Sequence, residues 1–406
     1  MRPPPLLPAL LSGLLLAGCG APARTTVFLA YGVNRDETLD TKLQTSLRER
    51  IGELQTAFEA VQPGVTIKVL VLPEGQVVEQ LHRRRRTGLS PDLITVNGST
   101  ALELQRQGLL RPVRLAESVV RPLDPGMRRQ LRLGGGELAA LPLVLQPQMA
   151  CFHRGRLARS PASLEELLQA AAAGARGGLP LDPLSLAWTS GATGAAPVLN
   201  GLMAGRPPDP AGRHELERWL TWLLGAELQQ QVTFYRDQDQ LRELLMADGL
   251  DWITCRSHQL GELRQRLGDQ LGVAPLPAGA GGPPSPLSRQ RVLAFGRDSS
   301  PAQARAAEAL ASFAVSPLIQ RSLTLTSLDL LPANRPVTPP AAPGSTLAVL
   351  LTAQAQADAQ PPDSWMNRVT PLQEPRLQAL LVGLLFGEVT PAQATDQLIT
   401  LLGQGR

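Results

Sequence analysis

Strand-like and helix-like segments alternate from residue 25 onward, and this order constrains the fold more than any other feature. Residues 25–31 (TTVFLAY) predict a strand, and residues 40–61 predict a helix because apolar side chains recur every three or four positions. Residues 65–72 and 91–96 predict two further strands, each followed by a helical pattern. Such alternation is typical of βαβ units on a largely parallel sheet, so we expect an α/β protein.

Strand-like and helix-like segments continue through the rest of the chain. A glycine-punctuated helical stretch fills the middle third, and short strands are expected near residues 149–153, 252–255 and 291–295. A Pro/Ala-rich linker at residues 336–345 precedes a last helical section. With 406 residues, 43% of them hydrophobic, the chain can form two lobes, each with its own core.

The N-terminus carries the strongest local signal. Arg2 precedes an apolar stretch at residues 6–17 that is too short to span a bilayer. It ends in Leu-Ala-Gly-Cys19, which resembles the bacterial lipobox, in which the cysteine thiol accepts a diacylglycerol. We interpret residues 1–18 as a lipoprotein signal peptide and residues 19–24 as a lipidated tether. The alternative is an ordinary signal peptide followed by a chance cysteine.

This interpretation places the mature protein in the bacterial periplasm or at the cell surface, tethered to the membrane by a lipid on Cys19. Two further cysteines remain, Cys151 and Cys255. That compartment permits disulfides. The pair forms either a bridge or two small buried apolar residues, and the sequence leaves both open.

Motifs of enzymes and metal sites are missing from the sequence. It has no GxSxG elbow, HExxH motif or Walker A loop, and its four histidines and three cysteines show no metal-ligand spacing. We therefore expect neither an enzyme nor a bound cofactor or metal.

Six blocks of sequence, in order, resemble the extracellular solute-binding proteins of ABC importers, in the maltose-binding-like group (family 1). Together they cover nearly all of the chain after the lipobox. The blocks are PDLITV with the following GLL (91–110), LP through CFH to PASLEEL (141–167), VAPLP (273–277), the alanine-rich segment 302–317, LLPAN (330–334) and GEVTPAQA (387–394).

The resemblance implies a two-lobed periplasmic-binding-protein fold, each lobe a mostly parallel sheet flanked by helices and joined to the other by hinge strands. Lobe 1 would comprise residues 25–147 and 288–340, and lobe 2 residues 148–287 and 341–406. The ligand would lie in the interlobe cleft, and the liganded form would dock, as a monomer, on the transmembrane subunits of a permease.

The aligned blocks also imply which residues face the ligand. They follow strand ends or lie at the crossings between lobes: Tyr31, Asn34, Asn97, Ser99, Gln146, Gln148, Trp188, Arg256, His258, Arg289, Gln290 and Trp365. Trp188 and Trp365 stand in loop-like contexts, where each is either a ligand-stacking ring or a core residue. Trp219 and Trp222 are expected in the core.

The ligand class follows from a departure from the family. Sugar sites use aromatic faces against C–H patches, yet only 3% of this chain is aromatic and it has two tyrosines. This composition disfavours a long oligosaccharide, ferric iron and polyamines, and favours a mono- or disaccharide or a glycosylated polyol. The alternative is a binding-protein-like lipoprotein that acts as a structural or signalling partner and transports no solute.

A block of four arginines at residues 83–86 raises the question of nucleic acid. The chain has 39 basic and 35 acidic residues, so its net charge of +4 gives no global attraction to a polyanion. The arginines end a predicted helix, where cations are favoured by the helix dipole. We expect a solvated face and no nucleic-acid partner, with anionic lipid or the permease as lesser alternatives.

Overall fold

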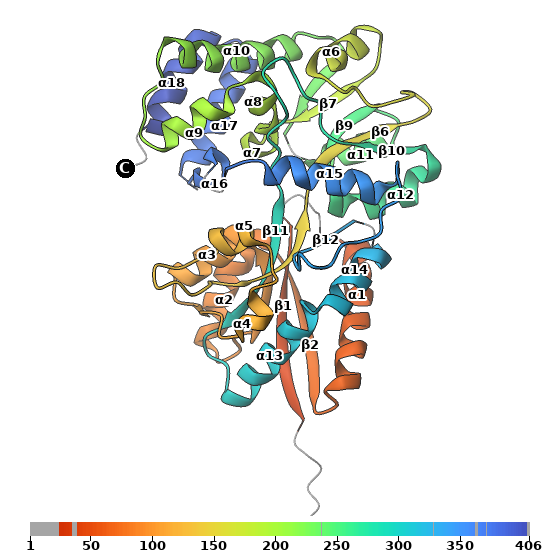
Figure 1. Cartoon of the computed structure of the whole chain (residues 1–406), viewed down its shortest axis with the longest axis vertical. Helices are drawn as coiled ribbons and strands as arrows, with labels where there is room; N and C mark the ends of the chain where they lie inside the picture. The colour runs from red at the N-terminus through yellow and green to blue at the C-terminus, as the bar shows by residue number, and fades with distance from the viewer. Residues whose placement is uncertain are drawn as a thin grey trace, which may run out of the picture.

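The computed structural model describes residues 24–34, 39–236, 238–327, 329–361, 364–370 and 372–403. The predicted signal peptide and lipidation site at Cys19 lie outside these residues. The described chain forms two lobes stacked end to end, each built around one sheet with helices on its faces (Figure 1). The predicted two-lobed α/β fold is therefore confirmed.

Lobe 1 holds, within the described residues, a seven-stranded sheet of order β12-β5-β11-β3-β1-β2, with β4 beside β11. Its strands are β1 (Thr25–Val33), β2 (Val65–Pro73), β3 (Leu93–Asn97), β4 (Leu110–Arg111), β5 (Leu141–Gln146), β11 (Arg289–Gly296) and β12 (Leu331–Pro332). Its helices are α1 (Thr41–Val61), η1 (Glu74–Gln76), α2 (Val77–Arg86), α3 (Gly98–Arg106), α4 (Glu117–Val120), α5 (Pro125–Gln130), α13 (Pro301–Ala314) and α14 (Pro317–Ser327).

Lobe 2 holds a five-stranded sheet, in the described part of the chain, of order β10-β6-β9-β7-β8. Its strands are β6 (Gln148–His153), β7 (Gly177–Pro180), β8 (Val232–Tyr235), β9 (Trp252–Arg256) and β10 (Leu271–Ala274). Its helices are α6 (Leu164–Ala172), α7 (Pro183–Leu186), α8 (Trp188–Thr193), α9 (Ala196–Met203), α10 (Pro210–Glu227), α11 (Gln238–Met246), η2 (Ser257–Gln259), α12 (Leu260–Leu267), η3 (Gly268–Gln270), α15 (Thr346–Asp358), α16 (Trp365–Arg368), α17 (Gln373–Leu385) and α18 (Pro391–Gly403).

The expectation of mostly parallel sheets needs correction. Strand β1 is parallel to β2 and β3, and β7 is parallel to β8 and β9. The strands that connect the lobes break the pattern, because β5 leaves lobe 1 while β11 returns to it. Strand β11 is consequently antiparallel to its neighbours β3 and β5, and β6 is antiparallel to β9 and β10. Both sheets are mixed.

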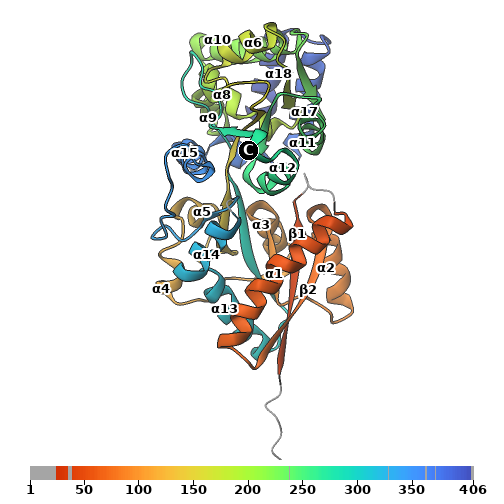
Figure 2. The same cartoon turned by 90° about the vertical axis from the view of Figure 1, so that its right-hand side faces the viewer.

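Three passages of the chain join the lobes. Strand β5 continues through Pro147 into β6, and β11 brings the chain back. The third passage follows β12 and leads to α15, which lies beside the crossing strands (Figure 1, Figure 2). One hydrophobic cluster follows this connection, since it includes Leu145 of β5, Met149 of β6 and Leu350 of α15.

Each lobe also has a core of its own. In lobe 1, Phe58 of α1 packs with residues of β1 and α13 such as Val27 and Leu310. In lobe 2, the core is centred on the buried indoles of Trp188, Trp219 and Trp365. Among the described residues, no helix combines the length and apolar character that a membrane crossing needs.

Candidate functional site

The parallel strands of lobe 1 end at the edge that faces lobe 2 (Figure 1). Polar residues lie at or just after these strand ends. Tyr31 lies near the end of β1, and Asn34 follows that strand. Glu74 begins η1 directly after β2, and Asn97 ends β3. The register aligns Tyr31 with Val71 and Thr95, so the three strand ends are neighbours. The structure thus brings together three of the predicted ligand residues.

A buried ion pair organises this edge. The Arg291 Nη1 atom of β11 lies 2.8 Å from the Glu74 Oε2 atom, and both side chains are almost fully buried. The same nitrogen donates to the side-chain oxygens of Asn34 and Asn97, each at 3.2 Å. The other Glu74 oxygen accepts the Asn97 N–H at 2.8 Å. Both charges are therefore paired and hydrogen-bonded, which burial of charge requires.

Backbone carbonyls also accept hydrogen bonds from the Arg291 guanidinium. Arg291 Nη2 donates to the carbonyls of Gly32 and Thr95, and its guanidinium carbon lies 5.3 Å from the centroid of the Tyr31 ring. Gly32 leaves room for the Glu74 carboxylate, because a Cβ at that position would lie 2.9 Å from it. Arg291 and Glu74 were not among the predicted site residues. Arg291 lies 217 positions from Glu74 in the sequence, so only the fold reveals their contact.

The first crossing holds both predicted glutamines. Gln146 ends β5 opposite Arg289 of β11, and Gln148 begins β6 opposite Arg256 of β9. Gln146 and Gln148 are 4% and 1% exposed, and Gln148 donates to the Ser185 carbonyl at 2.7 Å. Their Oε1 atoms are buried and have no hydrogen-bond partner among the described residues. Buried acceptors of this kind are suited to ligand hydroxyls.

Lobe 2 contributes a second buried arginine. Arg256 ends β9, is 1% exposed, and donates from Nη2 to the Ser185 hydroxyl at 2.8 Å. The Ser185 hydroxyl in turn donates to Asp182, which caps α7. Gln259 accepts the Arg256 backbone N–H at 2.9 Å. His258 lies half-buried in the following turn, η2. Of the predicted pair, Arg256 lies opposite Gln148, and His258 follows two residues later in the chain.

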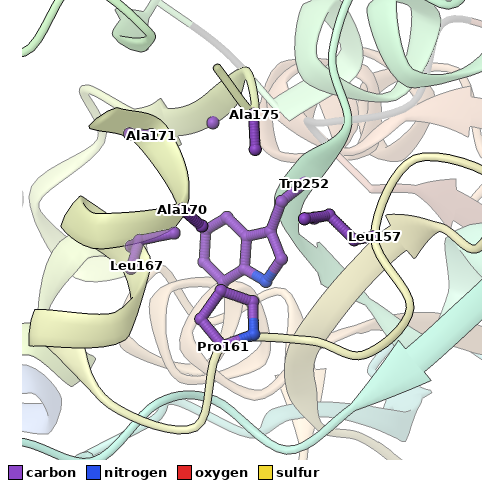
Figure 3. Close-up of a pocket in the computed structure, with 8 residues that line it drawn as sticks. Leu157, Pro161, Leu167, Ala170, Ala171, Ala175 and Trp252 are labelled. Carbon is purple, nitrogen blue, oxygen red and sulfur yellow. The ribbon is translucent and has the colours of Figure 1, made fainter. Parts of the chain in front are cut away.

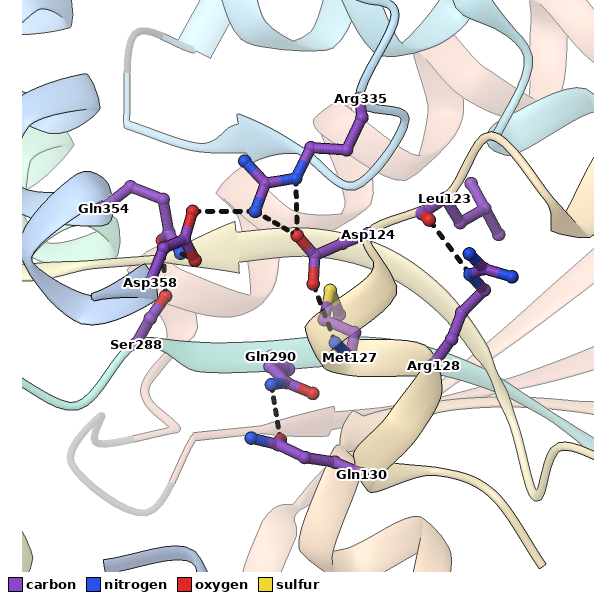
Figure 4. Close-up of polar contacts among 10 residues, drawn as sticks. All are labelled: Leu123, Asp124, Met127, Arg128, Gln130, Ser288, Gln290, Arg335, Gln354 and Asp358. Atoms are coloured by element: carbon purple, nitrogen blue, oxygen red, sulfur yellow. Dashed lines mark hydrogen bonds and ion pairs between the residues drawn. The ribbon is translucent and has the colours of Figure 1, made fainter. Parts of the chain in front are cut away.

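The remaining polar candidates lie at the margin. Ser99 is exposed in the first turn of α3. Arg289 and Gln290 are partly buried at the start of β11, and the Gln290 side chain donates to the Gln130 side chain (Figure 4). These residues form a rim around the more deeply buried amides.

The two predicted ligand tryptophans, Trp188 and Trp365, lie in the core of lobe 2. Trp188 is 0% exposed and Trp365 is 1% exposed, both inside the lobe 2 core. The Trp365 ring meets that of Trp219 edge-on, with centroids 6.2 Å apart. Neither indole presents a face toward lobe 1 in this structure. Their loop-like sequence context did not reveal this, because each begins a short helix that packs inward.

A small apolar pocket in lobe 2 does not extend the site. Leu157, Pro161, Leu167 and Trp252 line it (Figure 3). Its free volume of about 10 Å³ holds about one water molecule. The pocket is far too small for a sugar. No group of three or more His, Cys, Asp or Glu side chains suited to a metal occurs among the described residues.

Polar contacts also tie the lobes together at the third passage (Figure 4). Arg335 donates from Nε to Asp124 of lobe 1 at 2.6 Å and from Nη2 to Asp358 of α15 at 2.7 Å. Burial opposes the charge of Arg335, but the contacts with Asp358 and Asp124 outweigh it and raise its pKa. Nearby, Ser288 at the β11 passage donates to Gln354 of α15 at 2.6 Å. The passages at Ser288 and Arg335 are therefore both tied to α15.

Comparison with protein families gives one match. The model of a family described as bacterial extracellular solute-binding proteins matches residues 53–350. A comparison with curated proteins found no match.

Comparison with solved structures gives many similar folds. The GacH receptor of Streptomyces glaucescens, solved unliganded and with acarbose, has a TM-score of 0.71 and 18% identity, covering 94% of this chain and 99% of that one. MalE from Bdellovibrio bacteriovorus bound to maltotriose has a TM-score of 0.69 and 16% identity, covering 94% of this chain and 99% of that one. The cyclic α-maltosyl-1,6-maltose binding protein of Arthrobacter globiformis has a TM-score of 0.70 and 14% identity, covering 94% of this chain and 99% of that one.

Proposed function

The chain belongs to the bacterial extracellular solute-binding proteins, and from this premise we propose that it is the membrane-anchored substrate-binding component of an ABC importer. It captures a small carbohydrate or a glycosylated polyol between its lobes and presents it to the transmembrane subunits of a permease. A family of binding proteins agrees with the expectation that this chain is not an enzyme.

The amides and arginines at the facing ends of the lobes carry the proposal. Asn34, Asn97, Gln146 and Gln148 supply carboxamides, which both donate to and accept from hydroxyl groups. Their positions on four different strand ends suit a ligand that is polar all round its edge. The similar structures from Streptomyces glaucescens and Bdellovibrio bacteriovorus hold acarbose and maltotriose, which are ligands of this kind.

The size of the ligand follows from the aromatic residues. Tyr31 is the partly exposed ring at the lobe 1 edge, while Trp188 and Trp365 are buried. A long oligosaccharide needs several exposed rings in a row. We therefore keep a mono- or disaccharide, or a glycosylated polyol used as an osmolyte, as the ligand class. Ser99, His258, Arg289 and Gln290 would contact it from the rim.

The lipid anchor is the second part of the proposal. An acylated Cys19 would hold the mature protein at the membrane, since each buried methylene contributes about 0.8 kcal/mol. Incorporation of labelled palmitate by the parent chain, and its loss in Cys19→Ala, tests this part separately.

A thermal-shift panel tests ligand capture. Residues 24–406 are heated with mono- and disaccharides, glycosylated polyols, amino acids and polyamines. A true ligand at a hundredfold excess over its Kd adds about 2.7 kcal/mol to stability. We expect a shift with a sugar or a glycosylated polyol, and calorimetry then gives the stoichiometry.

The outcome that contradicts transport is equally specific. Absence of a shift with every compound would favour the other reading, a lipoprotein that serves as a structural or signalling partner. The buried state of Trp188 and Trp365 is the observation that keeps this alternative in view.

A further inference from the structure

Arginines gather on lobe 1 at the end of α2 that points away from lobe 2 (Figure 1). The last turn of α2 is Arg83-Arg84-Arg85-Arg86, and Arg83, Arg85 and Arg86 are exposed. Arg106 at the end of α3 is also exposed. The two helix ends are neighbours, because the His82 ring of α2 is hydrogen-bonded to Gln107 just after α3.

A further arginine joins them from the other end of the sequence. Arg297, exposed just after β11, donates to the Gly108 carbonyl at 3.3 Å, and Arg85 donates to the same oxygen at 3.4 Å. Two guanidinium groups therefore converge on one carbonyl. We call this surface the basic foot, made of Arg83, Arg84, Arg85, Arg86, Arg106 and Arg297.

Acidic partners neutralise only part of the foot. Asp298 lies 3.4 Å from Arg85, and Glu103 pairs with Arg106. Glu79 of α2 lies in the first turn, at the opposite end of that helix. A helix C-terminus carries only about half a negative charge, so the positive charge of the foot exceeds what the dipoles of α2 and α3 offset.

An exposed apolar side chain accompanies the charges. Leu89 follows α2, its N–H donates to the Arg84 carbonyl at 2.9 Å, and its side chain is 63% exposed. An apolar side chain beside several arginines is the composition that binds a membrane surface, with charge on the headgroups and the apolar group between them.

The start of the described chain lies at the same end. Strand β1 begins there, away from lobe 2 (Figure 1). Short contacts connect it to the foot: the Phe28 N–H donates to Asp92, and the Gly296 N–H, next to Arg297, donates to the Asp92 carbonyl. Gln303 of α13 donates to both Thr26 and Asp92.

The proposed lipid on Cys19 would keep this end close to a bilayer. Six residue steps separate Cys19 from Thr25, and a fully extended chain of that length reaches about 20 Å. The foot is connected to the tethered strand through Asp92, which accepts the Phe28 N–H, and through Gln303.

We propose that the basic foot of lobe 1 rests on anionic phospholipid headgroups and holds the anchored protein end-on, with lobe 2 directed away from the bilayer. This proposal rests on the lipid anchor proposed above. The attraction is electrostatic, so it falls with ionic strength as the screening length shortens.

Vesicle binding by the unanchored chain tests the foot without the anchor. Residues 24–406 contain both sheets and every helix described above. They are sedimented with vesicles of equimolar phosphatidylglycerol and phosphatidylcholine, and with pure phosphatidylcholine. We expect binding to the anionic vesicles alone, and its loss at about 1 M salt, where the screening length is about 3 Å.

A triple variant and a matched control locate the surface. Each arginine near an anionic surface contributes about fivefold to partitioning, so Arg83→Gln/Arg86→Gln/Arg297→Gln should weaken it by about 100-fold. The control is Arg206→Gln/Arg368→Gln/Arg376→Gln, which removes the same charge from exposed positions of lobe 2. The control should bind as the parent does.

Several outcomes would overturn the proposal. They are equal weakening in the two triple variants, undiminished binding by the foot variant, no binding by the parent chain, or equally tight binding of the parent to duplex DNA at the same salt. Thermal unfolding of each variant checks its fold. The sugar panel and palmitate labelling report separately on the proposed function, so its failure is distinguishable from failure of the foot.

Discussion

At the scale of single residues, one arginine defines the lobe 1 edge. Arg291 contacts Glu74, Asn34 and Asn97, and so fixes the loops after three strands at once. Its buried charge is compensated only while Glu74 is present. The arginine is therefore a positioning residue for the amides that we propose hold the ligand.

Removal of one member of this ion pair should cost more stability than removal of both. Arg291→Met leaves the Glu74 carboxylate buried and unpaired, which costs about 3–5 kcal/mol. The double variant Arg291→Met/Glu74→Leu should recover much of that loss. Urea unfolding of the parent, the two single variants and the double variant gives the coupling energy. Losses below about 1 kcal/mol, as for exposed pairs, would mean that the pair is solvated.

The buried tryptophans give a prediction about ligand affinity. Trp188→Phe keeps a ring in the lobe 2 core and should leave the Kd within about twofold of the parent, since contacts of the core do not reach the ligand. Tyr31→Ala removes the ring at the lobe 1 edge and should weaken binding about tenfold. Calorimetry with the ligand found in the panel measures both. A weaker Kd in Trp188→Phe with an unchanged one in Tyr31→Ala would reverse the assignment.

The sequence predicted the site residues unevenly for a physical reason. Asn34 and Asn97 were expected from the aligned blocks, and they lie at one edge because the ends of parallel strands meet there. Glu74 also follows a strand, but a carboxylate in a turn is usually solvated. Side chains along β11 point alternately to the two faces of the sheet. The register of β11 with β3 and β5 decides which residues the Arg291 side chain meets. Sequence periodicity does not give that register.

At the scale of elements, a disulfide joins two strands of lobe 2. Cys151 of β6 and Cys255 of β9 are bonded, with their Cα atoms 5.7 Å apart and both side chains fully buried. This resolves the alternative that the cysteine spacing left open. The bridge lies one residue before Arg256, so it also fixes the strand end that carries this part of the site.

Loss of the bridge should destabilise the fold measurably. The bond closes a loop across 104 positions, and removal of such a bridge costs about 2–5 kcal/mol. Cys151→Ala/Cys255→Ala should show this loss by chemical denaturation, and the double variant should not respond to reductant. Equal stability of the parent with and without reductant, once mass spectrometry shows full reduction, would contradict the prediction.

Most elements were predictable, and the exceptions are informative. Residues 40–61 and 65–72 became α1 and β2 because their apolar periodicity and flanking turns agree. Strand β7 reads GGLP and has no β-branched or aromatic residue, whereas all four residues of β8, VTFY, are favoured in strands. Strand β7 forms by pairing with β8 and β9. Tertiary context, not local propensity, makes β7 a strand.

At the scale of the whole molecule, the connections between lobes determine how it can move. The passages at Ser288 and Arg335 are joined through Gln354 and Asp358 of α15, and the passage at Pro147 lies beside that at Ser288 because Gln146 pairs with Arg289. Rotation about this region would change the separation of the facing strand ends while each sheet stays intact. A hinge of this kind closes by absorbing φ/ψ changes in a few linking residues.

Ligand binding should therefore compact the molecule with little change in tryptophan fluorescence. All five tryptophans lie on lobe 2 elements, four of them at 1% exposure or less, and rotation about the hinge would carry lobe 2 as a unit. Trp222 is on α10, at the end of lobe 2 away from lobe 1 (Figure 1). Small-angle scattering should show a smaller radius of gyration with ligand, while the emission maximum stays constant. A shifted emission with an unchanged radius would place the ligand inside lobe 2 and exclude closure between the lobes.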